Sequence, residues 1–278
     1  MSDKIVPEGK FVDVGDGLRV HFQEEGAGAP LVFLHGSGPG ASGWSNFRRN
    51  YPFFAERGFR ALVPDTLGFG YSSKPDVNYG MDFVVGALTR FLDAVGAEKV
   101  ALVGNSHGGA MAIQFALQFP ERTSHLVLMA PGGLEERETY MEMEGIRAML
   151  RATLGTPTSP ASLTRESLRR VFALQLHDPA LLTDDIIEER FQIAETQPPR
   201  VFTTLAVPHL APELSKLRCP VFAWWGVDDR FCPVSGAMRI AESCAGARVM
   251  VLNQCGHWVM VEHAALFNRT TLDFLEMR

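Results

Sequence analysis

Short apolar runs alternate with stretches of helical spacing over most of the chain. Strands are predicted at residues 31–34, 60–65, 100–104, 126–129, 221–225 and 248–252, and helices at residues 44–56, 81–95, 106–119, 235–245 and 264–277. Before them, residues 11–14 and 18–24 flank a Gly-Asp-Gly turn, which predicts a β-hairpin. Apolar strands that alternate with helices are typical of an α/β fold, with a mostly parallel sheet flanked by helices on both faces.

The alternation stops in the middle of the chain. Residues 134–207 carry no strand pattern, and helical spacing recurs at residues 141–154, 162–174 and 183–195. We therefore expect an all-helical insertion in the α/β core. The predicted organisation is a core in two parts, residues 1–133 and 209–278, with a helical lid at residues 134–208.

Composition narrows the class of protein. The chain has 278 residues, 46% of them hydrophobic, which suits one large α/β domain with an insertion, or two small domains. The net charge of −6 comes from interspersed acids and bases, and no run of about 18 apolar residues occurs, so we expect neither a nucleic-acid surface nor a membrane span. No apolar signal core begins the chain, and the four cysteines lack zinc-site or disulfide-framework spacing. We expect a cytoplasmic protein with reduced thiols and no metal or other cofactor.

The candidate chemistry begins at Gly104-Asn105-Ser106-His107-Gly108, between a predicted strand and a predicted helix. Gly-x-Ser-x-Gly in this setting is the nucleophile elbow of serine hydrolases, in which a strained turn exposes the serine and glycines avoid collisions. The motif alone is weak, because glycine and serine are common. It becomes informative when a base, an orienting acid and oxyanion donors stand in the right places.

Two loops after late predicted strands supply the base and the acid. In this fold class the acid follows the serine in the chain, and the histidine follows the acid. His257, just beyond the last predicted strand, is preferred over the other seven histidines by its placement. Asp228 and Asp229 both follow the strand at 221–225. We favour Asp229, and Asp228 stays open as the alternative.

Two backbone N–H groups are expected to form the oxyanion hole. One belongs to His107, which follows the nucleophile, and the other to Ser37, in the His-Gly loop after the strand at 31–34. Backbone donors do not depend on the side chain, so a serine at position 37 is compatible with this role. The alternative for the loop is a flexible connection.

Together these residues resemble the meta-cleavage product hydrolases, which are carbon–carbon bond hydrolases of the α/β-hydrolase superfamily. The resemblance covers nearly the whole chain. It is strongest in HGSGPGASGWSN (35–46), DTLGFGYS (65–72), GNSHGG (104–109), LVLMAPGGL (126–134), GVDDRFCP (226–233) and CGHW (255–258). The Gly-Ser-Gly-Pro-Gly loop followed by Trp-Ser-Asn is more specific than the elbow, which many esterases share.

The resemblance implies an activity. The substrates would be 2-hydroxy-6-oxohexa-2,4-dienoates, made when dioxygenases open the rings of catechols, biphenyl diols or steroid catechols. Ketonisation of the dienol would precede hydrolysis beside the C6 carbonyl, which gives a carboxylic acid and a 2-hydroxypentadienoate. The residues matching the family's site are Ser106, Asp229 and His257 as triad, and Asn46, Asn105, Arg190 and Trp258 as substrate contacts. The family is usually dimeric or larger, so a homodimer or higher homo-oligomer is expected.

Arg190 also has support of its own. On a helix from residue 183 it shares a face with Ile186, Ile187 and Ala194. A guanidinium in an apolar stripe needs a partner, and a substrate carboxylate could be gripped by its planar fork. Spacing alone favours an ion pair with a nearby acid, or a surface arginine, and the resemblance reverses that order.

Some questions stay open at this stage. His107 stands where the family usually has Met, Leu or Phe. At a helix N-terminus its side chain is expected to be neutral. The side chain either fills the pocket wall or contacts the acyl side of the substrate. Met141, Met143 and Met149 either adapt the pocket or fill the lid's own core. The sequence does not choose the acyl group, or between Ser106 and water as nucleophile. A carboxylesterase or lactonase with the same triad is the alternative function.

Overall fold

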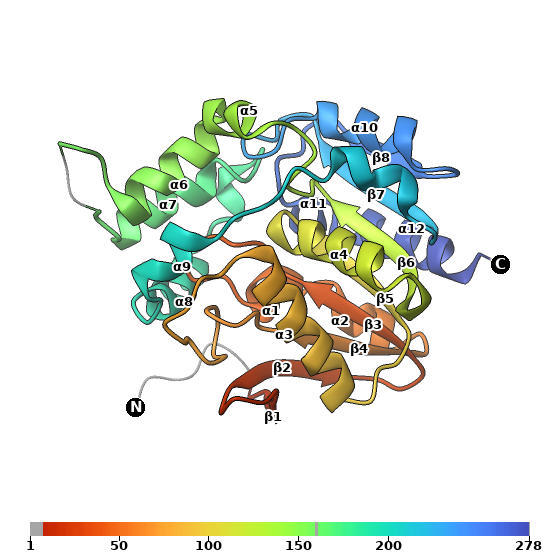
Figure 1. Cartoon of the computed structure of the whole chain (residues 1–278). Coiled ribbons are helices and arrows are strands. Elements are labelled where there is room, and N and C mark those ends of the chain that lie inside the picture. Colours follow the sequence, from red (N-terminus) through yellow and green to blue (C-terminus); the bar gives the residue numbers. More distant parts are fainter. Residues whose placement is uncertain (1–7, 159–160, 278) are drawn as a thin grey trace.

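A computed structural model describes residues 8–158 and 161–277 of the chain (Figure 1). Its strands form one eight-stranded sheet in the order β1-β2-β4-β3-β5-β6-β7-β8. The strands are β1 Lys10–Asp13, β2 Arg19–Glu25, β3 Ala29–Leu34, β4 Phe59–Pro64, β5 Val100–Asn105, β6 Thr123–Met129, β7 Val221–Gly226 and β8 Arg248–Leu252. The β1–β2 and β2–β4 pairs are antiparallel and the others are parallel. The predicted hairpin and mostly parallel sheet are confirmed, and the fold is that of the α/β hydrolases.

Helices cover both faces of this sheet. Those of the α/β core are α1 Gly43–Phe47, α2 Tyr51–Ala55, α3 Met81–Ala94, α4 His107–Gln118, α10 Ser235–Ser243, α11 Val259–Glu262 and α12 Ala264–Glu276. Along β3, Val32 and Leu34 pack into the apolar cluster under α3, α4 and α10, whereas Leu31 and Phe33 pack into the cluster under α1, α2, α11 and α12. This alternation follows from the period of two in a strand, and it explains why the central strands are apolar throughout.

One predicted helix is two helices in the structure. The stretch predicted at residues 44–56 divides into α1 and α2, with Pro52 in the first turn of α2. Proline has no N–H to donate to the carbonyl four residues earlier, and its ring collides with that carbonyl. A continuous helix through Arg48 and Pro52 is therefore excluded, although the apolar spacing continues across the break.

Between β6 and β7 the described residues add no strand to the sheet. They form α5 Arg137–Glu142, α6 Glu144–Leu154, α7 Arg165–Ala173, α8 Asp184–Ala194 and α9 Pro199–Thr204, which gather at one end of the molecule (Figure 1). Among the described residues, short 3-10 helices lie at Pro179–Leu181 and Ala211–Lys216 in this region, and at Pro120–Arg122 before β6. The domain boundaries at 134 and 208 and the action of these helices as a lid stay predictions.

Two details of the inserted helices differ from expectation. The helix predicted at 141–154 is interrupted at Met143, whose backbone is extended, so that α6 begins at Glu144. The N–H of Gly145 then donates to the carbonyl of Arg230 at 2.8 Å, and Gly145 packs so closely on Phe231 that a Cβ would lie 2.4 Å from its ring. This contact with a distant loop, which local spacing does not contain, accounts for the break. Helix α9 was not predicted.

Candidate active site

Ser106 occupies a strained turn between β5 and α4. Its φ of 55° lies in the left-handed region that non-glycine residues rarely adopt. A Cβ on Gly104 would lie 2.5 Å from the carbonyl oxygen of Gly108, and a Cβ on Gly108 would lie 2.1 Å from that of Leu34. Only glycine fits at these two positions. The collisions that any other side chain would cause are those that the Gly-x-Ser-x-Gly pattern predicts.

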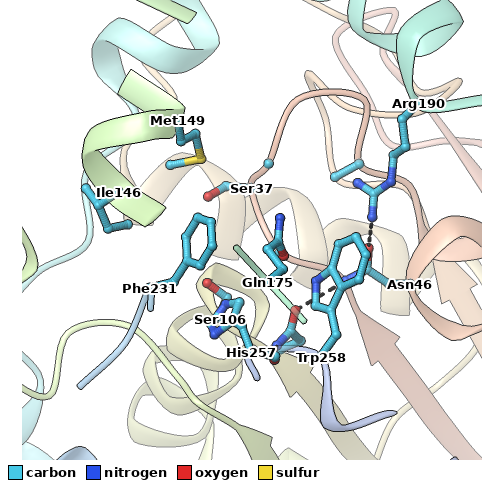
Figure 2. A pocket seen from close by; sticks show the side chains of 14 residues that line it. Ser37, Asn46, Ser106, Ile146, Met149, Gln175, Arg190, Phe231, His257 and Trp258 are labelled. Atoms are coloured by element: carbon cyan, nitrogen blue, oxygen red, sulfur yellow. Dashed lines mark hydrogen bonds between the residues drawn. The ribbon is translucent and has the colours of Figure 1, made fainter. Parts of the chain in front are cut away.

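His257 and Asp229 come from the loops after β8 and β7. Nδ1 of His257 lies 2.7 Å from Oδ2 of Asp229, and the other carboxylate oxygen accepts the backbone N–H groups of Phe231 at 2.7 Å and Cys232 at 2.9 Å. These contacts hold the carboxylate, which in turn orients the imidazole with a proton on Nδ1 and leaves Nε2 as a proton acceptor. His257 and Ser106 line the same pocket (Figure 2).

Asp228, the alternative orienting acid, lies in a different environment. Its Oδ2 is 2.8 Å from Nδ1 of His177, and both side chains are about 40% exposed. Asp228 therefore forms a surface pair with the turn after α7, while Asp229 is buried against His257. The two neighbouring aspartates differ in the direction in which the loop turns each side chain.

The loop that carries Ser37 is held by a buried histidine. Nδ1 of His35 lies 2.7 Å from the carbonyl oxygen of Gly36, and Nε2 accepts the N–H of Thr66 at 2.9 Å. Burial lowers the pKa of His35, so the ring is neutral, and it donates on one side while accepting on the other. The loop is thus fixed against β4, and Ser37 lines the pocket beside Ser106.

The backbone N–H of His107 stays a predicted oxyanion donor. His107 is the first residue of α4, where a helix leaves its N–H groups without intrahelical partners. The side chain does not line the pocket that the described residues form, and its buried Nε2 finds no hydrogen-bond partner among them. Its pKa is lowered to about 4, first by burial and then by the repulsion that a protonated His35 would add. The imidazole is neutral as expected, but burial rather than the helix terminus is the main cause.

A chain of polar side chains leads from Arg190 to the loop of His257. Nη2 of Arg190 donates to Oδ1 of Asn46 at 3.0 Å, and Nδ2 of Asn46 donates to Oδ1 of Asn105 at 3.3 Å. Nδ2 of Asn105 donates in turn to the carbonyl oxygens of Met129 at 3.2 Å and His257 at 3.3 Å. Residues from four separate segments are therefore joined into one end of the pocket.

Arg190 is a buried cation without a complete set of partners. It is 2% exposed, and its guanidinium carbon lies 5.1 Å from the ring centres of both Phe172 and Trp258. Burial lowers its pKa to about 10, with Glu189 opposing the shift, so it stays charged at neutral pH. Nε has no hydrogen-bond partner, and no carboxylate of the described residues lies within 4.0 Å. The surface position that spacing alone favoured is wrong.

The opposite wall of the pocket is mainly apolar. Ile146 and Met149 reach it from α6, and Phe231 stacks on His257 with ring centres 5.2 Å apart. Figure 2 shows these side chains across from Arg190, Asn46 and Trp258, with Gln175 between the two groups. The spacing of three residues in α6 could have indicated Ile146 and Met149 as one face. Met149 has two sets of contacts, because it lines the pocket and also packs against the apolar cluster beneath the inserted helices.

Gln175 was not predicted at all. It follows α7, and its carbonyl oxygen accepts the N–H of His257 at 2.8 Å and of Trp258 at 3.3 Å. Its side chain lines the pocket. No periodicity or motif singles out a glutamine after a helix, so only the folded arrangement identifies it.

The pocket has the character of a small-molecule site. It joins a charged, hydrogen-bonding end to an apolar end, with Ser106 and His257 on its wall. A few placed polar groups among apolar side chains are typical of ligand sites. The arrangement can bind an elongated molecule that has a carboxylate at one end and a less polar substituent at the other.

The described residues contain no group of three His, Cys, Asp or Glu side chains placed to hold a metal ion. None of the helices in residues 8–158 and 161–277 is long and apolar enough to cross a membrane. The four cysteines are free thiols, three of them buried.

Comparison with known proteins identifies the family of the chain. Residues 29–264 match the family model of the alpha/beta hydrolase fold. The chain is 35% identical over 280 residues to the 2-hydroxy-6-oxo-6-phenylhexa-2,4-dienoate hydrolase of Burkholderia cepacia, with 96% of each chain covered. It is 34% identical, with the same coverage, to the 2-hydroxy-6-oxononadienedioate/2-hydroxy-6-oxononatrienedioate hydrolase of Comamonas testosteroni. The chain belongs to the meta-cleavage product hydrolases.

A solved structure of a meta-cleavage product hydrolase extends the comparison to three dimensions. The enzyme of Pseudomonas fluorescens IP01 superimposes with a TM-score of 0.83 at 29% identity, and 96% of this chain and 97% of that chain are covered. The names of the two relatives differ in the acyl side, which is a phenyl group in one and carries a second carboxylate in the other. Membership among the meta-cleavage product hydrolases therefore does not choose the acyl group.

Proposed function

We propose that the protein hydrolyses a carbon–carbon bond of a 2-hydroxy-6-oxohexa-2,4-dienoate from the degradation of an aromatic or steroid compound. The observation that carries the proposal is Arg190, a buried guanidinium with a free Nε at one end of the pocket that holds Ser106. A hydrolase of simple esters has no use for a cation at this place. A dienoate needs one, because its carboxylate would otherwise be buried unpaired.

Each predicted substrate contact has a place in this scheme. Arg190 would bind the carboxylate through charge-assisted hydrogen bonds, with Asn46 holding the guanidinium. Asn105 would be a polar group beside the reacting dienoate, and the indole of Trp258 would cover the flat dienoate. The apolar wall of Ile146, Met149 and Phe231 would receive the acyl side.

The reaction adds water across the bond between C5 and C6. A carbanion at C5 is a poor leaving group, so ketonisation at C2 with protonation at C5 comes first and provides an electron sink. An oxygen nucleophile, Ser106 or a water molecule activated by His257, then adds to the C6 carbonyl. Cleavage places the electron pair of the C5–C6 bond in a dienolate beside the carboxylate, which Arg190 stabilises. If Ser106 is the nucleophile, a water molecule activated by His257 then hydrolyses the acyl ester of Ser106. On either route the products are a carboxylic acid and 2-hydroxypenta-2,4-dienoate.

The groups that transfer protons and stabilise the negative charge at the C6 oxygen would lie away from Arg190, near Ser106. His257 takes the proton from the nucleophile and returns it to the leaving fragment, and Asp229 stabilises the imidazolium. The backbone N–H groups of Ser37 and His107 would hold the oxygen that becomes negative at C6.

The substitution Arg190→Gln tests the proposal. It removes the charge but keeps a planar, hydrogen-bonding side chain, and we expect kcat/KM on a dienoate to fall about 100-fold, the worth of one or two charge-assisted hydrogen bonds. The assay follows the loss of visible absorbance of the coloured dienoate, with mass analysis of the acid released. The control substrate is p-nitrophenyl acetate, which has no carboxylate and should be affected far less. Ester hydrolysis much faster than dienoate hydrolysis, with no effect of Arg190→Gln on either, would indicate a carboxylesterase or lactonase instead.

Three coarser expectations belong to the same proposal. We expect a homodimer or higher homo-oligomer, which sedimentation would measure, and a cytoplasmic location, which the free thiols favour. We also expect the helices α5 to α9 to act as a lid, because α6 and α8 both contribute pocket residues.

A further inference from the structure

Two neighbouring contacts join helix α8 to the region of α1, and only one of them belongs to the pocket. Arg190 donates to Asn46 at 3.0 Å inside the pocket. Next to it, Nη1 of Arg48, the residue that ends α1, lies 2.5 Å from Oε2 of Glu189. Neither Arg48 nor Glu189 lines the pocket. The four residues thus form two parallel links between α1 and α8, because Asn46 and Arg48 come from α1 and its end and the other two come from α8.

The ion pair is more deeply buried at its acidic end. The side chain of Glu189 is 1% exposed and that of Arg48 is 24% exposed. Oε1 of Glu189 is buried and has no hydrogen-bond partner among the described residues. A buried carboxylate with one free oxygen is costly, so a purely structural role would be served as well by an apolar contact.

Glu189 lies between two cations. Burial raises the pKa of Glu189, and the charges of Arg48 and then Arg190 oppose that rise. Without Arg48, Arg190 is the other cation that acts on Glu189, and its Nε is unpartnered. A carboxylate of the protein would then compete with the carboxylate of the substrate for the same guanidinium.

The position of α8 also affects the loop of Ser37. Gly40, with a φ of 66°, packs directly on the backbone of α8, and a Cβ there would lie 1.9 Å from the carbonyl oxygen of Arg190. The amide N–H of Gly40 also donates to Gln197 beyond the end of α8. A shift of α8 would therefore displace both the carboxylate-binding end and the loop next to the nucleophile.

We propose that Arg48 and Glu189 are positioning residues for the carboxylate site. Their ion pair holds α8 so that Arg190 faces the pocket, and it keeps Glu189 from neutralising Arg190. The proposal rests on the proposed function, because it assumes that Arg190 receives a substrate carboxylate. Arg48 and Glu189 would act through Arg190, since neither of them touches the substrate.

The substitution Arg48→Met tests it, because methionine keeps the length of the stem and removes the charge. We expect KM for a 2-hydroxy-6-oxohexa-2,4-dienoate to rise on the order of tenfold, with a smaller change in kcat, as for other misplaced binding groups. For p-nitrophenyl acetate, which has no carboxylate, kcat/KM should change less than about twofold. Arg48→Lys keeps the charge and should restore most of the affinity for the dienoate.

A second variant guards against loss of folding. The double substitution Arg48→Met with Glu189→Gln leaves no unpaired carboxylate at position 189 and no competitor for Arg190, so it should fold and recover part of the dienoate affinity. An unchanged KM in Arg48→Met, a parallel loss on the ester, or no recovery in the double variant would overturn the proposal. A wild-type protein that hydrolyses the ester but not the dienoate would instead overturn the proposed function, and with it this inference.

Discussion

Asp228 and Asp229 show how surroundings divide the roles of identical side chains. Asp229 is buried, accepts two backbone N–H groups and faces His257, whereas Asp228 pairs with His177 at the surface. The first arrangement fixes a tautomer, and the second is an exposed pair of a kind that contributes little.

The substitution Asp229→Asn should lower kcat by roughly 10³- to 10⁴-fold, because the amide favours the wrong imidazole tautomer while the geometry stays intact. The matched control is Asp228→Asn, for which we expect a change of about threefold or less. Steady-state kinetics on a dienoate would measure both. An equal loss in the two variants would contradict the assignment of Asp229.

The pKa of His107 makes a prediction about stability. The folded-state value of about 4 is below the value of about 6.5 in an unfolded chain, so the unfolded state binds the proton first as the pH falls. The neutral, buried ring therefore costs stability between pH 6.5 and 4, by about 3 kcal/mol at the lower end. His107→Leu removes this dependence. The free energy of unfolding of the variant, relative to wild type, should improve by that amount between pH 7 and pH 4.

Urea unfolding at several pH values would measure this difference in the free energy of unfolding, and a constant gap between the two proteins would contradict it.

The same variant, His107→Leu, addresses the open question of the side chain's role. Since His107 does not line the pocket, the relative rates on phenyl, alkyl and carboxyalkyl dienoates should change less than about twofold.

At the scale of elements, the turn from β5 to α4 depends on close backbone packing. Gly108→Ala would place a methyl group 2.1 Å from the carbonyl oxygen of Leu34, in backbone that cannot move without shifting β3. We expect a loss of at least about 3 kcal/mol in the free energy of unfolding. Gly86→Ala is the matched control, because the added methyl in α3 meets nothing within 4 Å.

That control should be stabilised by about 0.5–1 kcal/mol, since alanine loses less backbone entropy than glycine in a helix. Thermal or urea unfolding of the two variants gives the comparison. Similar stabilities for Gly108→Ala and Gly86→Ala would show that the elbow tolerates a side chain.

At the scale of the whole molecule, the catalytic loop and the inserted helices are bound to each other. Besides the carbonyl of Gln175, the carboxylate of Glu262 connects them, because it accepts the N–H of His177 at 2.6 Å and that of Gly256 at 2.6 Å. The turn after α7 is therefore attached to the loop that holds His257. One wall of the pocket and the base are placed by the same set of hydrogen bonds.

The sequence by itself determined the parallel sheet, the hairpin and the elbow, and it predicted Ser106 and His257 as site residues. These results follow from strand and helix periodicity, from turn chemistry and from chain order. Arg190 was selected by the resemblance to a family, because its spacing alone favoured an ion pair or a surface position. The sequence could not determine the break before α6, because that depends on Arg230 and Phe231 more than eighty residues away.

Only the tertiary structure decided between Asp228 and Asp229, brought Gln175 to the pocket and paired Arg48 with Glu189. In each case the outcome depends on which distant groups meet and lose water together. Charges interact strongly when they are buried, whereas an exposed ion pair contributes little. Local spacing does not show which of the two applies. The chemistry of this site was therefore readable from the chain, whereas its electrostatic arrangement was not.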